Sequence, residues 1–322
     1  MTRQEFQQLT KTVLLVDGAT GSNLMAMGMP RGVCTEAWVL DHKDVLQALQ
    51  RAYLEAGSRV IYAPTFGANR FNLAKHGLEG KIREMNLTLA GYSQEVAKAF
   101  LSESEVLEGS VHENPTPAAD STGREKTLRK KVYVAGDISP TGGMMQPMGD
   151  MTYEKAFEIY QEQVRYLVEA GVDMIAVETM YQIEETMAAI DAVHSVCDLP
   201  VLCTVTVDAD GSIFTGGNAT EAAVSFEATG ADAVGVNCSV GPDQLVSIIR
   251  NIRENVSVPV IAKPNAGMPQ IDDAGNAFYS MDAKTFAGYM KALVDAGAGI
   301  IGGCCGTTPE YIRQMAKLAE RM

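Results

Sequence analysis

The chain has 322 residues, of which 46% are hydrophobic and 20% are charged, as in an ordinary globular protein. It contains no run of about 18 apolar residues that could span a bilayer and no secretory signal at its N-terminus, so we expect a cytoplasmic protein. With 26 basic and 40 acidic residues, the formal net charge of −14 disfavours nucleic acid and membrane surfaces as partners.

Eight runs of apolar and β-branched residues predict strands along the chain. They cover residues 12–17, 58–63, 131–136, 172–178, 200–206, 232–237, 258–263 and 298–302. Amphipathic patterns predict helices near 43–56, 80–104, 152–170, 182–196, 218–230, 242–255, 281–296 and 308–321. Eight strand–helix alternations with nearly continuous apolar strands favour an α/β fold with a parallel sheet, a single (β/α)8 TIM barrel, over an open doubly wound sheet.

One segment interrupts this alternation. Residues 105–130 are rich in Glu, Ser, Pro, Thr, Gly and Lys and have almost no apolar side chains after Leu107. We interpret them as a polar surface insertion within a single barrel domain that spans residues 1–322. The insertion lies between a helix and the following strand, which is the end of a barrel away from its chemistry.

Cysteines at the ends of two predicted strands point to a metal site. Cys238 follows the sixth strand, and Cys304 and Cys305 follow the eighth between glycines. Three protein ligands with one open position are typical of catalytic zinc, whereas structural zinc has four. Two alternatives stay open for these cysteines, namely apolar core residues or a redox pair. The remaining cysteines, Cys34, Cys197 and Cys203, are expected to be reduced and structural.

Zinc with three thiolate ligands would carry a charge of about −1 and be a weak Lewis acid toward water or a carbonyl. It would suit a substrate thiol, whose pKa falls on coordination while its sulfur stays nucleophilic. The pattern therefore predicts thiol alkylation at a centre formed by Cys238, Cys304 and Cys305.

Two acidic residues at other strand ends indicate an amino-acid substrate. Asp17 and Glu178 lie at the ends of the first and fourth strands and could bind an ammonium group, although a helix cap or a salt bridge to Lys or Arg is the alternative for each. Backbone N–H groups of Gly18, Ala19 and Thr20 could bind the substrate carboxylate.

These motifs together resemble the homocysteine S-methyltransferase family over nearly the whole chain. The resemblance is carried by Asn237-Cys238, by the run from Gly302 through Cys304 and Cys305 to Pro309, by Asp17-Gly18-Ala19-Thr20-Gly21 and by Val177-Glu178-Thr179. The runs 64–69, 136–142 and 263–267 resemble most the N-terminal homocysteine-binding module of cobalamin-dependent methionine synthase.

The resemblance implies a zinc-dependent enzyme of methionine biosynthesis that methylates the homocysteine thiolate. Cys238, Cys304 and Cys305 would bind Zn²⁺, Asp17 and Glu178 would bind the amino group, and Thr65 and Asn237 would line the pocket. No catalytic side chain is implied beyond the activated substrate thiolate.

The methyl donor is the least determined part of this expectation. The resembling synthase continues into folate, cobalamin and activation modules, so we expect a donor from outside this chain, and specifically methylcobalamin on a separate corrinoid protein. The alternatives are S-methylmethionine or another small sulfonium, or a homocysteine-binding subunit that is inactive without its corrinoid partner.

Overall fold

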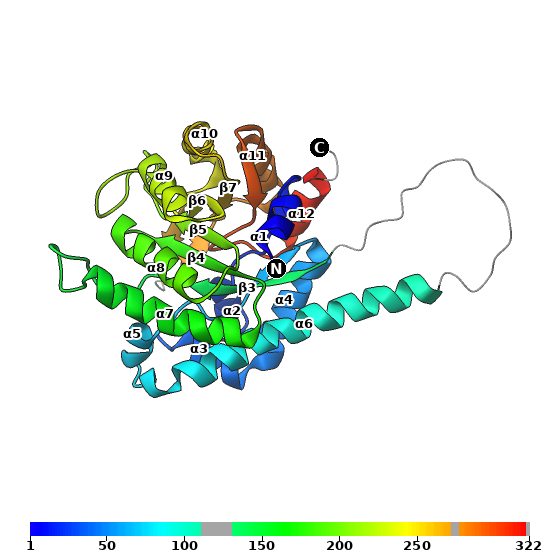
Figure 1. The fold of residues 1–322 in the computed structure, drawn as a ribbon. Helices are drawn as coiled ribbons and strands as arrows, with labels where there is room; N and C mark the ends of the chain where they lie inside the picture. Colours follow the sequence, from blue (N-terminus) through cyan, green and yellow to red (C-terminus); the bar gives the residue numbers. More distant parts are fainter. Residues whose placement is uncertain (111–130, 272–276, 320–322) are drawn as a thin grey trace.

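The protein folds around eight parallel strands. The computed structural model describes residues 1–110, 131–271 and 277–319 (Figure 1). The strands occupy all eight predicted positions: β1 (Leu14–Leu15), β2 (Val60–Tyr62), β3 (Tyr133–Ile138), β4 (Met174–Met180), β5 (Val201–Val205), β6 (Ala233–Cys238), β7 (Val260–Pro264) and β10 (Ala298–Ile301).

The strands close into a barrel. Each strand pairs in parallel with its neighbour in the order β1-β10-β7-β6-β5-β4-β3-β2. A further parallel bridge joins Val16 to Val60 and so brings β1 against β2. The prediction of a TIM barrel is therefore confirmed, and the carboxyl ends of all eight strands share one rim.

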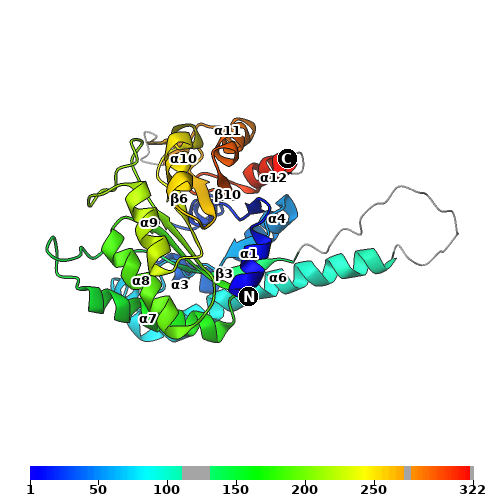
Figure 2. The same cartoon turned by 45° about the horizontal axis from the view of Figure 1, so that its top comes forward.

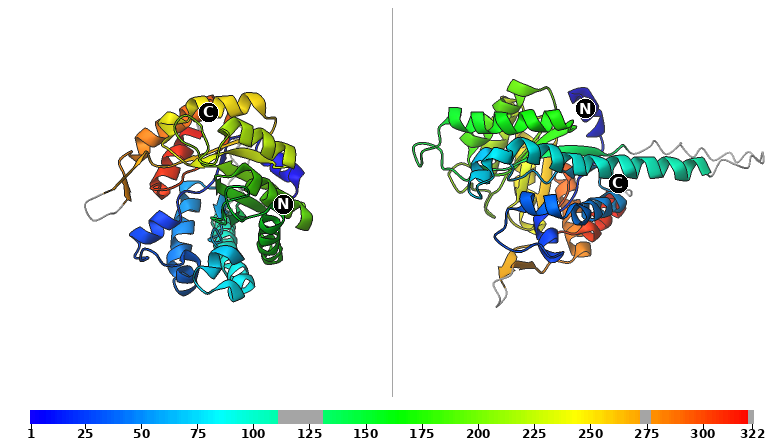
Figure 3. Two further views of the ribbon diagram at one scale, coloured as in Figure 1. Left: turned by 90° about the vertical axis from the view of Figure 1, so that its left-hand side faces the viewer. Right: turned by 90° about the horizontal axis from the view of Figure 1, so that it is seen from below.

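Helices surround this barrel in chain order (Figure 3). The eight predicted helices correspond to α4 (Lys43–Ala56), α6 (Ile82–Ser110), α7 (Tyr153–Ala170), α8 (Ile183–Val196), α9 (Ala219–Thr229), α10 (Val246–Asn255), α11 (Ala283–Asp295) and α12 (Pro309–Ala319). The last helix, α12, packs against both α11 and α4 and completes the ring (Figure 2). Gly57 and Gly230 end α4 and α9 with left-handed φ angles of 116° and 110°, a conformation that glycine adopts without a steric penalty.

Several short elements are absent from the sequence-based prediction. They are α1 (Arg3–Leu9), α2 (Gly21–Ala26), α3 (Thr35–Asp41), α5 (Arg70–Ala74), the 3₁₀ turns η1 (Glu79–Lys81) and η2 (Pro242–Gln244), and the antiparallel pair β8 (Pro269–Ile271) and β9 (Ala277–Tyr279). Helix α1 buries Phe6 against inward-facing barrel side chains such as Leu14, Val16 and Met174. Helix α1 thereby contributes to the interior core of the barrel.

The predicted polar insertion lies mainly outside the described residues, which exclude 111–130. Residues 105–110 belong to α6, which continues past its predicted end at 104 and extends away from the barrel (Figure 1). No helix in the described ranges is long and apolar enough to cross a membrane.

Close strand packing at Gly235 generates a test of the barrel. Gly235 on β6 is paired with Ile261 on β7, and a Cβ atom at this position would lie 2.0 Å from the Ile261 carbonyl oxygen. We expect Gly235→Ala to lower the free energy of unfolding by about 1–3 kcal/mol, since neither backbone can yield without disturbing the sheet. Denaturant unfolding measures this loss.

Gly288 provides the matched control. It lies within α11, and an added Cβ would meet no heavy atom of the described residues within 4 Å. Gly288→Ala should stabilise the protein by about 0.5–1 kcal/mol through helix propensity. Equal effects of the two substitutions would contradict the packing described for β6 and β7.

Candidate functional site

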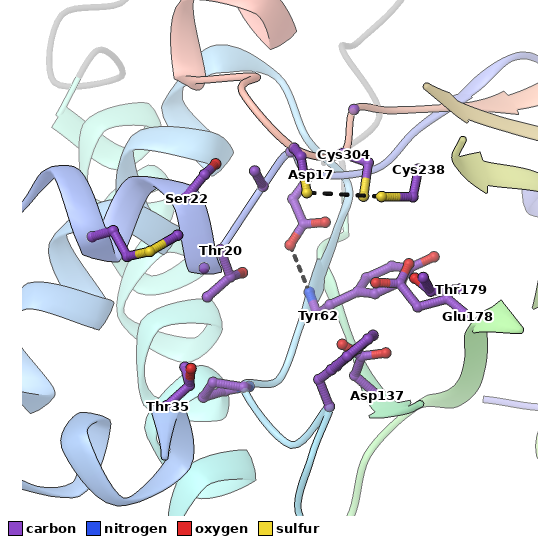
Figure 4. A pocket seen from close by; sticks show the side chains of 18 of the residues that line it. Asp17, Thr20, Ser22, Thr35, Tyr62, Asp137, Glu178, Thr179, Cys238 and Cys304 are labelled. Carbon is purple, nitrogen blue, oxygen red and sulfur yellow. Dashed lines mark hydrogen bonds between the residues drawn. The ribbon is translucent and has the colours of Figure 1, made fainter. Parts of the chain in front are cut away.

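Three cysteine side chains meet at the carboxyl ends of β6 and β10 (Figure 4). Cys238 is the last residue of β6, and Cys304 and Cys305 follow β10. Their Sγ atoms all lie within 4.8 Å of one another, and those of Cys238 and Cys305 are 3.8 Å apart. Two sulfurs bound tetrahedrally to one zinc at about 2.3 Å would be separated by about 3.8 Å. The donor set therefore fits zinc in both chemistry and spacing.

The three thiols do not all ionise without a cation. Hydrogen bonds from Cys238 and Cys304 hold the pKa of the Cys305 thiol at about 3, so this sulfur carries the negative charge. Hydrogen bonds to Cys238 and Cys305 raise the pKa of Cys304 well above its usual range, and burial adds to the effect. Since like charges this close repel, a divalent cation is what allows three thiolates to coexist here.

The backbone that carries these groups is held in an uncommon conformation. Thr179, Cys238 and Ser239 have left-handed φ angles of 61°, 59° and 53°, which are costly for residues other than glycine. The Asn237 side chain accepts a hydrogen bond from the Thr179 N–H at 2.7 Å and donates one to Thr179 Oγ1 at 2.8 Å. Asn237 thus ties the end of β4 to the end of β6, with its Nδ2 3.9 Å from the Sγ of Cys304.

Glycines beside the paired cysteines are required by close packing. A Cβ at Gly303 would lie 2.3 Å from Thr307 Oγ1, and one at Gly306 would lie 2.3 Å from the ring of Tyr279. Tyr279, from β9, also forms a side-chain hydrogen bond with Cys305. The hairpin of β8 and β9 therefore packs directly over one of the three sulfurs.

A cavity of about 840 Å³ opens beside the cysteines at the same rim. Its walls include all three cysteines together with the predicted residues Asp17, Gly18, Ala19, Thr20 and Glu178 (Figure 4). The volume lies in the range of about 300–1,000 Å³ that ligand sites usually have. The structure thus brings most of the predicted site residues together in one cavity.

A buried lysine shares this cavity with the acidic residues. Lys263 Nζ lies 2.7 Å from Glu178 Oε2 and 3.5 Å from the ring centroid of Tyr62, and the Lys263 side chain is only 4% exposed. The alternative that the sequence left open for Glu178, a salt bridge, is therefore realised. Asp17 instead accepts a hydrogen bond from the Tyr62 N–H at 2.7 Å, and burial raises its pKa to about 7 despite the nearby lysine charge.

Three predicted contact residues are already engaged within the protein. Thr65 is fully buried outside the cavity lining, and its hydroxyl donates to the Asp137 carbonyl at 2.9 Å. Asn237, as described above, is also buried outside the lining. Ala19 lines the cavity, but its N–H donates to Thr307 Oγ1 at 3.2 Å.

Sequence reasoning assigned no role to several polar residues in the lining, among them Tyr62, Asp137, Lys263 and Tyr279. The signal for Asp137 and Lys263 is a charged residue inside an otherwise apolar strand, where a charge has to find a partner or face a cavity. Tyr62 and Tyr279 carry no such signal, because an aromatic residue in a strand is ordinary.

Comparison of the sequence with known proteins gives consistent matches. The chain is 28% identical to methionine synthase of Mycobacterium leprae over 327 residues, covering 98% of this chain and 25% of that protein. It is also 28% identical to methionine synthase of Mycobacterium tuberculosis over 319 residues, covering 96% of this chain and 25% of that protein. The chain thus spans about a quarter of the length of these relatives.

Comparison of structures agrees on the fold. The metallated form of the homocysteine methyltransferase MmuM from Escherichia coli superposes with a TM-score of 0.75 at 18% identity, over 98% of this chain and 99% of that one. Its oxidized form gives a TM-score of 0.75 at 19% identity, over 95% and 96%. The family profile described as homocysteine S-methyltransferase matches residues 14–319. Because that match covers nearly the whole sequence, the chain belongs to the homocysteine S-methyltransferase family.

Proposed function

We propose that this protein transfers a methyl group to the thiol of homocysteine, giving methionine, with Zn²⁺ bound by Cys238, Cys304 and Cys305. The observation that carries the proposal is the convergence of three sulfur atoms within 4.8 Å in the wall of a cavity that acidic residues also line. Family membership supports the reaction class. The metallated relative from Escherichia coli supports a metal in this fold.

Cys238, Cys304 and Cys305 would hold the zinc, which would supply the positive charge that lowers the pKa of a substrate thiol and keeps it a thiolate at neutral pH. The chain's own residues then bind and orient the rest of the substrate. Asp17 and Glu178 accept hydrogen bonds from the ammonium group, and the backbone N–H groups of Gly18 and Thr20 face the carboxylate, since the Ala19 N–H is already bonded to Thr307. Held at both ends, the substrate presents its sulfur to the donor in a fixed direction.

Methyl transfer requires no side chain that gains or loses a proton. The sulfur lone pair forms the new S–C bond while the bond between the methyl carbon and its donor breaks, and that electron pair stays with the donor. The apolar part of the cavity, which includes Met25, Ala26, Met29 and Phe66, excludes water from this region.

A methylcorrinoid protein is the donor that the surface favours. Exposed large apolar side chains gather on the loops that follow β1, β2, β3, β5 and β7, at the rim that bears the cysteines. They are Met25, Met27, Phe66, Met148, Phe214, Met268, Ile271 and Phe278. Apolar side chains exposed around one site are typical of surfaces that bind another protein. A protein-bound donor would use this rim, whereas a small donor would need the cavity alone.

The second candidate donor is a small sulfonium such as S-methylmethionine. Glu36 lines the same cavity, is 6% exposed and accepts a hydrogen bond from the Gly67 N–H at 2.6 Å. A buried carboxylate could attract a cationic donor to this part of the cavity. Under this alternative no partner protein is needed for turnover.

Removal of one cysteine tests the metal site. We expect Cys304→Ser to weaken zinc binding by at least about 100-fold and to abolish homocysteine methylation, because a direct ligand contributes more than the outer contacts that tune it. Elemental analysis of reduced, anaerobically purified protein measures the zinc.

Cys197→Ser is the matched control, since Cys197 is half-buried at the end of α8 and outside the cluster. It should keep zinc and activity. Full zinc content in Cys304→Ser would contradict the assignment of Cys304 as a zinc ligand.

The buried carboxyl of Asp17 predicts a pH-dependent stability difference. Its pKa is raised to about 7 by burial, so the folded state resists ionisation of Asp17 as pH rises from about 4 to 7, and the resulting cost is fully present above pH 7. Asp17→Asn should therefore raise the free energy of unfolding by up to about 4 kcal/mol at pH 8 and by little at pH 4. The same variant should lose homocysteine affinity. Chemical denaturation at both pH values measures the difference, and equal stability of variant and wild type at pH 8 would contradict a carboxyl group whose ionisation burial opposes.

The donor is tested with zinc-loaded protein, homocysteine and either a methylcorrinoid protein or S-methylmethionine. We expect turnover with the corrinoid protein and none with the sulfonium. Turnover with S-methylmethionine alone would establish the second candidate. If the protein binds homocysteine but turns over with neither donor, it would be a substrate-binding subunit and not a complete methyltransferase.

A further inference from the structure

Two carboxylate oxygens in the cavity have no hydrogen-bond partner. Asp17 is 2% exposed and Asp137 is 6% exposed, and both line the cavity. The Oδ1 atom of each is buried without a partner, and no other carboxylate oxygen among the described residues is in that condition. Since a buried acceptor without a donor costs about 1–3 kcal/mol, two in one cavity indicate a ligand that brings donors.

The carboxylate of Glu178, which lines the same cavity, is already partly occupied. Lys263 Nζ donates a hydrogen bond to Glu178 Oε2 at 2.7 Å and lies over the ring of Tyr62. Figure 4 shows the Asp17, Asp137 and Glu178 side chains lying around Tyr62. The electrostatic environment of Asp137 includes Glu178, Lys263, Asp17 and Glu36, so these ionisable groups form one cluster.

An ammonium group has three N–H donors and no acceptor. Asp17 and Asp137 each offer a free oxygen, whereas Glu178 has to share its carboxylate with Lys263. With Asp17 and Glu178 alone, an incoming ammonium group would lack acceptors for its three N–H donors, because Lys263 already occupies Glu178. A third carboxylate with a free oxygen completes the set of acceptors.

We propose that Asp137 binds the amino group of the substrate together with Asp17 and Glu178. This inference rests on the proposed function and adds a residue to its amino-acid subsite. It restricts the substrate to thiols that carry a free α-ammonium group, because a ligand without one leaves the Asp17 and Asp137 oxygens buried and unpaired.

The backbone around Asp137 holds this carboxylate in place. Asp137 N–H donates to Thr65 Oγ1 at 3.0 Å, and Thr65 Oγ1 donates to the Asp137 carbonyl at 2.9 Å. These bonds do not involve the Asp137 side chain, so an asparagine at this position keeps them. Burial raises the pKa of the Asp137 carboxyl well above its usual range, so the folded protein without substrate does not depend on a negative charge there. Asp137→Asn should therefore fold normally.

The test compares two thiols that differ only in the amino group. Homocysteine and its des-amino analogue 4-mercaptobutyrate are titrated into zinc-loaded wild-type protein and Asp137→Asn by calorimetry. We expect the variant to bind homocysteine about 10- to 100-fold more weakly and 4-mercaptobutyrate unchanged, since the acidic group that faces the ammonium is replaced by a neutral amide and only the first ligand carries an ammonium. Asp208→Asn, an exposed change of the same charge after β5, should leave both affinities unchanged.

The outcomes separate this inference from the proposed function. Failure of wild-type protein to bind homocysteine would overturn the proposed function, and the inference with it. Homocysteine binding by wild type that Asp137→Asn leaves unaltered would overturn the inference alone. Equal weakening of both thiols would also overturn it, because the residue would then act on the site as a whole, and zinc content measured on each sample shows whether the metal has been lost.

Discussion

Crowding of three sulfur atoms is the constraint on which the site depends. Within 4.8 Å, the thiols of Cys238, Cys304 and Cys305 share a single negative charge unless a cation joins them. The surrounding structure keeps them close. Asn237 fixes the end of β6 against Thr179, and the glycines beside the cysteine pair allow the chain to pack against Thr307 and Tyr279. A barrel is suited to this task, because it brings the ends of strands far apart in sequence to a single rim.

The cavity beside the sulfurs combines four carboxylates, those of Asp17, Glu36, Asp137 and Glu178, with the buried Lys263. Lys263 offsets part of the acidic charge and pairs with Glu178, which leaves the other carboxylates to face a cationic group of the ligand. A zwitterionic amino acid meets this requirement, because its ammonium group faces the acids. The chemistry of the thiol and the recognition of the amino group thus occupy adjacent parts of one cavity, which fixes the distance between the two ends of the substrate.

The order of strands and helices follows from the sequence, since hydrophobic periodicity reports burial directly. The cysteine cluster is also predictable, because residues that end strands of a parallel barrel share its rim. The ion pair of Lys263 with Glu178 could not be predicted from the sequence, because the two residues are 85 positions apart and their side chains meet only through barrel geometry.

Thr65 and Asn237 illustrate a second limit of the sequence-based prediction. Both lie at or just beyond the end of a strand, but Thr65 bonds to Asp137 and Asn237 to Thr179, and which neighbour such a side chain meets is set by the barrel and not by the sequence spacing. The hairpin of β8 and β9 escapes prediction because its strands have three residues each.

X-ray absorption at the zinc edge, before and after addition of homocysteine, tests the central claim most directly. The account predicts three sulfur ligands at about 2.3 Å in the substrate-free protein and a fourth sulfur at a similar distance once homocysteine is bound. An unchanged sulfur count on saturation with homocysteine would contradict substrate activation at this centre.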